Sequence, residues 1–331
     1  MGLPDTRSPF LLILSSLLPP ISISNTMASD TGPAWFARHP DGSIHFSGVP
    51  ERLKAHPALK QRGIALAAPS KPGVVFRTNN SEGADHVVKV LDLATEELPI
   101  YERLLRDIDN PANHTVPCEI ERSGHPILIM PMLSRMHSVV NFDCKSQSQL
   151  LRFFYQLVED VDYLHQLHIV HMDLRVGNVL AGMPRDATFN PVVKPHRVYI
   201  IDFDTARQYE LGPGVQQAIE LPETQTVPPK GLTHFDPYSW DVYCLGRVLE
   251  WIMKEYCERK QGVPRIAQWY INWLLRDEQG CRGVCRCRPT ARTARLVLTF
   301  LRLLGPLVDI HDSVVGPAKP RAGQLHTSRT P

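Results

Sequence analysis

The sequence predicts an α+β fold in which a small strand-rich part comes first and a larger, mainly helical part follows. Up to about Leu133 the chain carries short apolar runs whose length and β-branched content are typical of strands. Beyond that point the two longest patterned stretches have apolar residues at helical spacing. The composition, 43% hydrophobic and 21% charged over 331 residues, is sufficient for a sizeable core and excludes wholesale disorder.

The strand-rich part contains four predicted strands and one predicted helix. The strands are expected at residues 63–68, 74–77, 86–91 and 127–133, and the helix at 96–107.

The helical part is built on two amphipathic stretches. In residues 150–167 one helical stripe carries the apolar side chains Leu150, Phe153, Phe154, Leu157, Val161 and Leu164. A second strongly apolar helix is predicted at 241–256. Two short strand-like runs, 168–171 and 197–201, lie between these helices. The segment that separates the two runs is longer than an ordinary connection, and we expect a surface insertion at 181–197.

Charge and cysteine content narrow the class of protein. The chain has 36 Lys and Arg against 34 Asp and Glu, a formal charge of +2, which is too weak to indicate nucleic acid or an anionic membrane as the main partner. Seven cysteines, an odd number spread over a long chain, do not form the pattern of a secreted disulfide framework. We therefore expect a cytoplasmic protein. The 29 prolines predict long loops.

The two ends differ from the rest of the chain. Residues 1–34 are interpreted as a disordered leader or as an extension of the reading frame beyond a true start at Met27, although the apolar run 9–23 leaves a secretory signal open. That run is too short to span a bilayer. Residues 311–331 are predicted to be a disordered tail, because from Gly316 onward they are rich in Pro, Gly, Ser, Thr and basic residues.

A cysteine cluster, Cys281, Cys285 and Cys287, has no clear role. Its spacing and the lack of a nearby histidine do not suit zinc, so a cysteine-rich connection between helices is the simpler interpretation.

Two neighbouring loops carry the residues that phosphoryl transfer requires. Asp173 and Asn178 follow one β-branched run, and Asp202 closes the next. Phosphoryl transfer needs oxygen ligands for Mg²⁺, a carboxylate that orients the attacking hydroxyl, and cations against the phosphate charge. Asp173 suits the base, Arg175 is a cation two residues further on, and Asn178 and Asp202 suit the metal.

These loops resemble motifs of the protein kinase-like superfamily. Residues 171–178, HMDLRVGN, resemble the catalytic loop HRDLxxxN, and residues 202–204, DFD, resemble the metal-binding DFG. Residues 236–246 resemble the buried helix of the large lobe. Residues 288–291, RPTA, resemble its late RPT segment. These four motifs occur in the family's order within residues 171–291, and the resemblance as a whole covers about 250 residues.

The resemblance implies a fold and further roles. It implies a two-lobed kinase-like domain at 35–310, with a small antiparallel-sheet N-lobe and one helix at about 59–133 and a larger, mainly helical C-lobe at about 134–310. Asp241 is expected to hold the catalytic loop through its backbone, His171 to pack within that loop, and Arg288 to serve as a structural anchor. The layout as a whole most resembles a fungal, basidiomycete-type group of kinase-like proteins.

Kinase chemistry also requires a strand lysine that binds the nucleotide phosphates. Lys89 lies centrally in an apolar run, where an unpaired ammonium would be costly to bury. Glu97 has the family's relation to the following helix, with Glu96 and Glu102 as alternatives. The alternative for Lys89 itself is an edge-strand residue that extends to solvent.

The hinge between the lobes is expected after the last strand of the small sheet. Met130 lies near the gatekeeper position, and the adenine is expected against Pro131, Met132 and Leu133.

The chain departs from the kinase pattern in four places. No GxGxxG precedes Lys89, which weakens the expectation of nucleotide binding. Met172 replaces an arginine that would pair with a phosphorylated loop. Asp204 replaces the glycine of DFG; aspartate tolerates a left-handed backbone, and its carboxylate is also available to the metal. Lys230 stands where a glutamate would pair with Arg288, unless Glu223 takes that place.

Three functions follow from this resemblance. The first is an ATP- and Mg²⁺-dependent protein kinase that phosphorylates Ser or Thr. It is expected to be a monomer that acts on a protein substrate of unknown identity, with no nucleic-acid or membrane partner. The second is a pseudokinase that binds partners through the same scaffold. The third is a small-molecule kinase of the aminoglycoside or choline type, since HMDLRVGN and IIDFD also resemble that group's motifs.

Overall fold

Short antiparallel sheets and several helices make up the structure, which is a computed structural model. It describes residues 35–41, 43–78, 85–221, 224–229, 233–260, 264–276 and 283–315, and for 141–143, 259–260 and 304–315 the backbone alone. The chain divides into two units, 1–34 and 35–331, and all described residues belong to the second.

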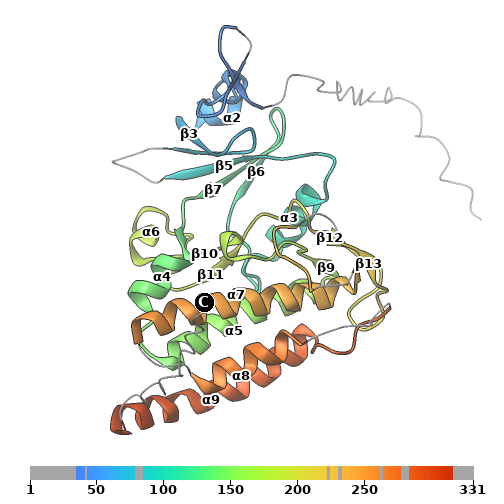
Figure 1. Cartoon of the computed structure of the whole chain (residues 1–331). Helices are drawn as coiled ribbons and strands as arrows, with labels where there is room; N and C mark the ends of the chain where they lie inside the picture. The colour runs from blue at the N-terminus through green and yellow to red at the C-terminus, as the bar shows by residue number, and fades with distance from the viewer. Residues whose placement is uncertain are drawn as a thin grey trace, which may run out of the picture. The chain divides into compact units, whose positions relative to one another are not determined.

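The largest sheet has five strands in the order β3-β4-β5-β7-β6, and every neighbouring pair is antiparallel. The strands are β3 (Leu66–Lys71), β4 (Val75–Thr78), β5 (His86–Val90), β6 (Glu119–Glu121) and β7 (Ile127–Pro131). Figure 1 shows this sheet above the long helices.

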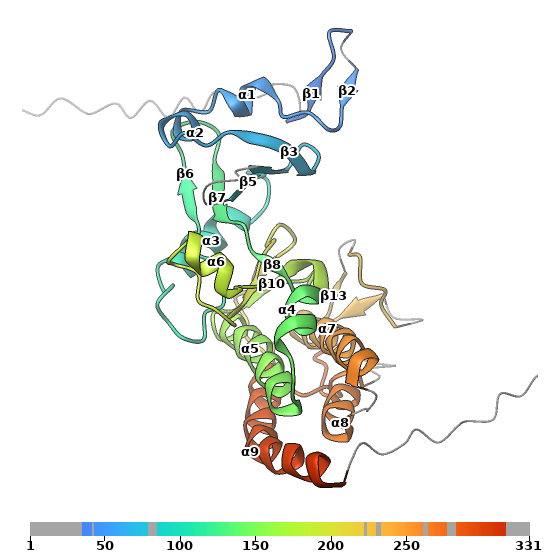
Figure 2. The same cartoon turned by 90° about the vertical axis from the view of Figure 1, so that its left-hand side faces the viewer.

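The two faces of the sheet pack against different elements, because side chains alternate along a strand. Phe76, Val88 and Ile129 form a core with Leu53 and Leu59. The last two residues come from α1 (Glu51–Lys54) and α2 (Pro57–Gln61), which Figure 2 shows on the side of the sheet away from the long helices. The hairpin of β1 (Ala37–Arg38) and β2 (Ile44–His45) precedes them.

The opposite face belongs to the main core of the molecule. Leu128 and Met130 share this core with Ile100 and Leu104 of α3 (Glu97–Leu105). The same core continues into α5 and α7, so the sheet and the helical part share one body of buried side chains.

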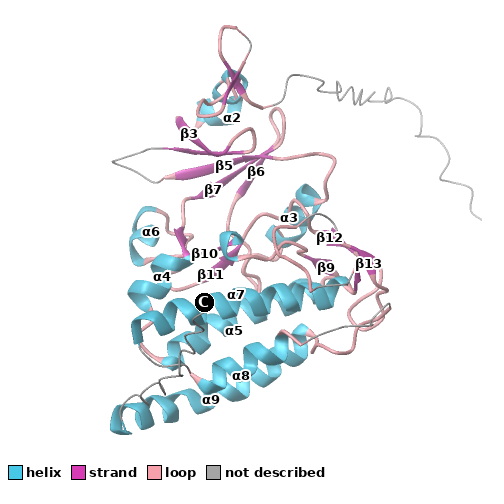
Figure 3. Ribbon diagram, in the orientation of Figure 1, coloured by secondary structure: helices cyan, strands magenta, loops and turns pink. Residues whose placement is uncertain are grey.

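Six further helices follow the sheet (Figure 3): α4 (Met136–Asp143), α5 (Gln147–Gln166), α6 (Pro184–Phe189), α7 (Pro237–Lys260), α8 (Arg265–Leu274) and α9 (Ala291–Val315). Helix α5 packs against both α7 and α9, and α8 packs against α7. Helix α5 begins where the Ser146 hydroxyl accepts a hydrogen bond from the Gln149 N–H. In the described part of the chain no helix combines the length and the apolar character needed to cross a bilayer.

Short strands connect these helices in three small sheets. They are β8 (Ser134–Arg135), β10 (Val179–Ala181) and β11 (Val198–Ile200) in the first, β9 (Ile169–Val170) and β12 (Arg207–Gln208) in the second, and β13 (Ile219–Glu220) and β14 (His234–Phe235) in the third. This mixed α+β structure is compatible with a kinase-like fold.

Most predicted elements are confirmed, with shifted ends. The strand predicted at 63–68 begins only at Leu66, because Gly63 adopts φ +65° and ends α2. Strand β6, with two glutamates in three residues, was not predicted. The predicted insertion, 181–197, contains α6, and its Phe189 and Val192 are exposed.

Candidate active site

The loop that follows β9 is held by the side chain of Asp241, a fully buried residue of α7. Its carboxylate accepts hydrogen bonds from the backbone N–H of His171 at 2.8 Å and of Met172 at 2.9 Å, and lies 3.2 Å from His165 Nε2. The neighbouring Trp240 donates its indole N–H to the carbonyl of Met172 at 2.7 Å. Trp240 and Asp241, consecutive residues of α7, therefore satisfy two N–H groups and one carbonyl group of this turn.

The backbone conformation and burial of Met172 account for a methionine where the kinase motif has an arginine. Its φ is +67°, in the left-handed region, which costs a non-glycine residue about 1–2 kcal/mol. Its side chain is completely buried in the main core. An arginine at this position would have to place a charge there, so the replacement by methionine fits the local packing.

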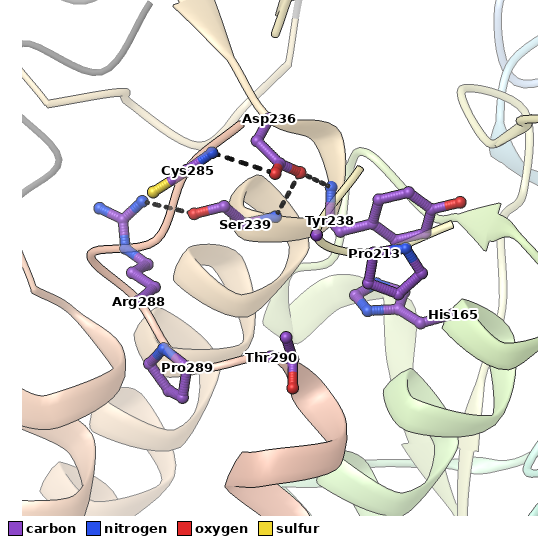
Figure 4. A pocket seen from close by; sticks show the side chains of 10 residues that line it. His165, Pro213, Asp236, Tyr238, Ser239, Cys285, Arg288, Pro289 and Thr290 are labelled. Atoms are coloured by element: carbon purple, nitrogen blue, oxygen red, sulfur yellow. Dashed lines mark hydrogen bonds between the residues drawn. The ribbon is translucent and has the colours of Figure 1, made fainter. Parts of the chain in front are cut away.

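The start of α7 is fixed by Asp236. Its carboxylate accepts the backbone N–H groups of Tyr238 at 3.0 Å, Ser239 at 3.2 Å and Cys285 at 3.3 Å (Figure 4). Burial raises the pKa of Asp236, and these three hydrogen bonds only partly offset that effect. The cap links α7 to the segment before α9 and so sets the position of Asp241 one turn further on.

Arg288 lies beside this cap. Its Nη1 is 3.4 Å from the hydroxyl of Ser239 (Figure 4). Its guanidinium lies 4.8 Å from the centre of the Tyr243 ring. Arg288, Ser239 and His165 are among the residues that line a small cavity of about 20 Å³. Glu223, which was weighed as the partner of Arg288, and Lys230, which stands at the position of the expected glutamate, lie outside the described residues.

Asp173 is surrounded by donors from its own loop and from the segment before β14. Its carboxylate accepts from Arg175 Nε at 3.0 Å, Asn178 Nδ2 at 3.4 Å and the backbone N–H of Gln225 at 3.4 Å. Asn178 Nδ2 also donates to the Asp173 carbonyl at 2.9 Å. Because the amide nitrogen of Asn178 makes these bonds, its oxygen is the atom that could ligate a cation.

Lys89 lies between two carboxylates. Its ammonium donates to Glu97 Oε1 at 2.6 Å and to Asp202 Oδ1. Lys89 and Glu97 are almost fully buried, whereas the side chain of Asp202 is 17% exposed. Three separate parts of the chain thus meet at one ammonium group: β5, α3 and the loop after β11. Lys89 and Asp202 are 113 positions apart in the sequence.

The alternatives weighed for these residues are excluded by their contacts. Glu96 accepts the backbone N–H of Gln208 at 2.9 Å, and Glu102 pairs with Arg122. The alternative for Lys89, an edge-strand residue that extends to solvent, is wrong, because β5 is the middle strand of the five and the Lys89 side chain is 5% exposed.

The pKa shifts of this group follow from burial and charge. Burial alone would lower the pKa of Lys89, but Glu97 and Asp202 raise it above its ordinary value. Burial would raise the pKa of Asp202, yet Lys89, with a smaller contribution from Lys71, holds it below its ordinary value. For Glu97 burial is the larger effect, and its pKa is raised despite Lys89. Lys89 and Asp202 therefore face each other as ions.

The residues after Asp202 continue this arrangement. Phe203 is fully buried, with its ring 5.2 Å from that of Tyr101 on α3 and 5.0 Å from that of His171. His171 also bonds through Nε2 to the carbonyl of Ile201 at 3.1 Å. The expectation that Asp204 takes the left-handed conformation is wrong: Asp202, with φ +71°, does so instead. The left-handed residue therefore lies two positions earlier than expected, at Asp202, whose carboxylate binds Lys89.

Asn178 and Asp202 could together ligate a divalent cation. The N–H of Ile201 donates to the Asn178 carbonyl at 3.0 Å, and Val179 pairs with Ile200, so the two side chains start from adjacent backbone. Carboxylate and amide oxygens suit Mg²⁺, which commonly takes one or two protein ligands and completes its shell with phosphate and water. Within the described residues, no group of three His, Cys, Asp or Glu side chains forms a self-sufficient metal site.

The predicted hinge residues lie at the end of β7. Met130 pairs with Val87 and Pro131 with His86, and the Met132 N–H donates to the Asp85 carbonyl at 2.9 Å. Leu133 is buried in the main core. Met130 and Pro131 also line a cavity of about 350 Å³ whose other walls come from the region of β6, α2 and the segment after α6. Neither Lys89 nor Asp202 lines this cavity.

Two contributors to the site were missed from the sequence. Gln225 acts through its backbone N–H, which no side-chain pattern can indicate. Lys71, at the end of β3, lies with its Nζ 3.6 Å from Asp204 Oδ2. Lys71 lies directly before a Pro-Gly turn, at the place where kinases have the glycine-rich loop, and this position could have indicated its role from the sequence. Of the cysteine cluster, Cys285 is buried and Cys287 exposed, whereas Cys281 lies outside the described residues.

Comparison with known proteins finds weak similarity to serine/threonine protein kinases. No family model matches the chain. A meiosis-specific serine/threonine-protein kinase, mek1 of Schizosaccharomyces pombe, is 21% identical over 193 residues, which is 55% of this chain and 40% of that protein. MEK1 of Saccharomyces cerevisiae, of the same description, is 25% identical over 154 residues, covering 41% and 29% of the two chains. These similarities support a protein kinase-like superfamily.

A third similarity is shorter. The death-associated protein kinase dapk-1 of Caenorhabditis elegans is 31% identical over 81 residues, which is 24% of this chain and 5% of that protein. The kinase-like chain thus spans less than half the length of each of these three relatives. The more specific affinity to a basidiomycete-type group stays a prediction.

Proposed function

We propose that this chain is an ATP- and Mg²⁺-dependent protein kinase that transfers the γ-phosphate to a Ser or Thr hydroxyl of a protein. The observation that carries the proposal is the contact of Lys89 with both Glu97 and Asp202. A buried ammonium held between two carboxylates from separate elements is costly to assemble, and such buried charged groups are concentrated at functional sites. The kinase similarities point to the same chemistry.

Each residue of the site has a role in this proposal. In the step itself, the Ser or Thr oxygen bonds to the γ-phosphorus, the bond from that phosphorus to the β–γ bridging oxygen breaks, and the hydroxyl proton passes to Asp173. Lys89, positioned by Glu97, binds the nucleotide phosphates, and Arg175 adds positive charge near Asp173. Asn178 and Asp202 are the residues that would hold Mg²⁺, and a bound Mg²⁺ would neutralise charge on the phosphate oxygens.

The proposal extends to the fold and to the partners. The β3–β7 sheet with α3 forms an N-lobe, the helices form a C-lobe, and the adenine lies against residues 131–133, with Met130 near the gatekeeper position. His171, Asp241 and Arg288 hold the C-lobe side of the site in place. The protein acts in the cytoplasm as a monomer on a protein substrate, and neither nucleic acid nor a membrane is its partner.

The test is phosphate transfer from ATP by the full-length chain. Transfer of γ-phosphate to a generic protein substrate or to the chain itself is expected, and both Asp173→Ala and Asp202→Ala should abolish it. Asp109→Ala, at an exposed position of the same residue type, is the matched control and should leave transfer unchanged. Transfer that persists in both site variants would reject the site. A panel of hydroxylated metabolites tests the small-molecule alternative.

A second candidate, a pseudokinase, is favoured by two observations. The β3–β4 turn lacks the glycines that cover phosphates in active kinases, and the Gln225 N–H already bonds to the Asp173 carboxylate. Thermal unfolding with ATP and Mg²⁺ separates the candidates, because a ligand that binds only the folded state raises the melting temperature. The kinase should be stabilised by ATP with Mg²⁺; a pseudokinase that binds no nucleotide should not.

A further inference from the structure

The turn between β3 and β4 cannot form a row of backbone donors for phosphates. It consists of Pro72, Gly73 and Val74. Pro72 has no N–H, and the Val74 N–H donates to the Lys71 carbonyl at 3.1 Å. Within this turn only Gly73 keeps an N–H that is neither absent nor bonded inside the turn. A phosphate chain bound here has to be met mainly by a side chain.

Lys71, the last residue of β3, supplies a suitable side chain. Its Nζ lies 3.6 Å from Asp204 Oδ2, and its positive charge helps to lower the pKa of Asp202. Unlike the buried Lys89, the Lys71 side chain is 53% exposed. Lys89 therefore binds Asp202 from inside the protein, and Lys71 pairs with Asp204, two residues further on, from the solvent side.

The turn that carries Lys71 is held by the N-terminal residues. Gly73 has φ +75°, and a Cβ added to it would lie 2.7 Å from the ring of Phe36. Phe36 in turn makes an edge contact with Phe46, with ring centres 6.2 Å apart. Figure 2 shows β1 and β2 next to the β3 end of the sheet. The close packing of Gly73 against Phe36 therefore fixes this turn and, with it, the backbone position of Lys71.

The ion pair with Asp204 does not account for Lys71 by itself. A half-exposed pair at this separation stabilises a protein by only about 0–1 kcal/mol. A polyphosphate, with several negative charges and strong acceptor oxygens, would compete well with Asp204 for the ammonium. The carboxylates of Asp202 and Asp204 would otherwise repel such a ligand, and Lys71 offsets that charge at the edge of the site.

We propose that Lys71 binds the β- and γ-phosphates of the nucleotide, in place of the backbone amides of a glycine-rich loop. This inference rests on the proposed function, and it concerns recognition of the phosphate chain. It predicts that the contribution of Lys71 depends on the number of phosphates and that Asp204 opposes it. Removal of the Asp204 charge should therefore strengthen the binding of ATP.

The experiment measures binding of ATP, ADP, AMP and adenosine to the full-length chain by titration calorimetry, with and without Mg²⁺. Lys71→Met should weaken ATP binding about tenfold, the size expected for loss of one charged contact, and ADP binding less. Binding of AMP and adenosine should not change. Asp204→Asn should tighten ATP binding. Lys60→Met, which removes the same charge from an exposed position of α2, is the control and should match the wild type.

The outcomes separate this inference from the proposed function. If the wild type binds ATP and Lys71→Met binds it equally well, Lys71 only pairs with Asp204 and the inference is overturned while the kinase proposal stands. An equal loss for adenosine and ATP also overturns it, because the effect would then be structural. If the wild type binds no nucleotide at all, both proposals fail. Thermal unfolding of each variant verifies that it is folded.

Discussion

The two sides of the candidate site are held by different kinds of interaction. On the helical side, the carboxylate of Asp241 is surrounded by the N–H groups of His171 and Met172 and by His165. On the sheet side, Lys89 is held by Glu97 and Asp202. The first side uses hydrogen bonds to the backbone, and the second uses opposite charges.

The difference determines how each side responds to change. Backbone donors cannot change their charge or move away, so the helical side has one stable arrangement. A triad of two carboxylates and one ammonium carries a net negative charge and is sensitive to pH and to bound anions or cations. The comparison predicts that the helical side is a rigid support and that a bound ligand would alter the ion pairs of the sheet side.

The largest effect is expected from Asp241→Ala. The substitution leaves two buried backbone N–H groups without an acceptor, and loss of one partner in such a buried network costs about 3–5 kcal/mol. Urea denaturation measures the change in the free energy of unfolding. Asp241→Asn keeps one acceptor oxygen and should lose less. If Asp241→Ala unfolds at the wild-type urea concentration, the helical side does not depend on this carboxylate.

Lys89→Met should have the next largest effect. It leaves the buried Glu97 carboxylate without its cation, at a cost of about 2–3 kcal/mol, since Glu97 can relieve part of it by binding a proton. The stability of this variant should therefore improve on mild acidification, relative to the wild type. Thermal unfolding as a function of pH measures this. A variant whose stability relative to wild type does not change with pH would show that Glu97 is not ionised in the native protein.

A smaller effect is expected from Trp240→Phe. Phenylalanine keeps most of the buried aromatic surface but removes the indole N–H that bonds to the Met172 carbonyl. The expected loss of stability is about 1–2 kcal/mol, the cost of an unsatisfied buried acceptor. Phe153→Leu, a core change away from this loop, provides a control for loss of aromatic volume. Equal losses in the two variants would indicate that packing alone, and not the hydrogen bond, matters at Trp240.

The smallest effect concerns acid stability. The pKa of Asp202 is below its ordinary value of 3.8 in the folded chain, so its ion pair stabilises the fold above that pH. This contribution is lost as the pH falls from 3.8 through the folded value. Asp202→Asn lacks the titrating group and should lose less stability than the wild type over that interval. Identical acid-unfolding profiles would contradict the ion pair with Lys89.

The sequence was most informative where a site residue can be recognised from its type and its immediate neighbours alone. The catalytic-loop residues 171–178 and the carboxylate at 202 follow directly on β-branched runs, and the structure brings them together. The assignment of Glu97 over Glu96 and Glu102 needed the structure. All three lie in the same short stretch, and only the rotation of α3 against β5 decides which carboxylate points at Lys89.

The departures from the kinase pattern also needed the structure. Met172 looked like the loss of a regulatory cation, but it is a buried side chain in a turn held by Trp240 and Asp241. Asp204 was expected to carry the left-handed turn, and Asp202 carries it. Backbone conformation at such positions depends on what neighbouring elements supply, and that is not encoded within a few residues.

By itself, the sequence determined the main strands of the large sheet except β6, the helices α3, α5 and α7, the residue types of the candidate site and the two loops that carry them, because periodicity and turn chemistry act over a few neighbouring residues. Only the tertiary structure decided which carboxylates reach Lys89, that Lys71 lies beside Asp204, and that Phe36 packs on Gly73. These contacts join residues far apart in the chain, and the packing of the sheet against α1, α2 and α3 fixes their geometry.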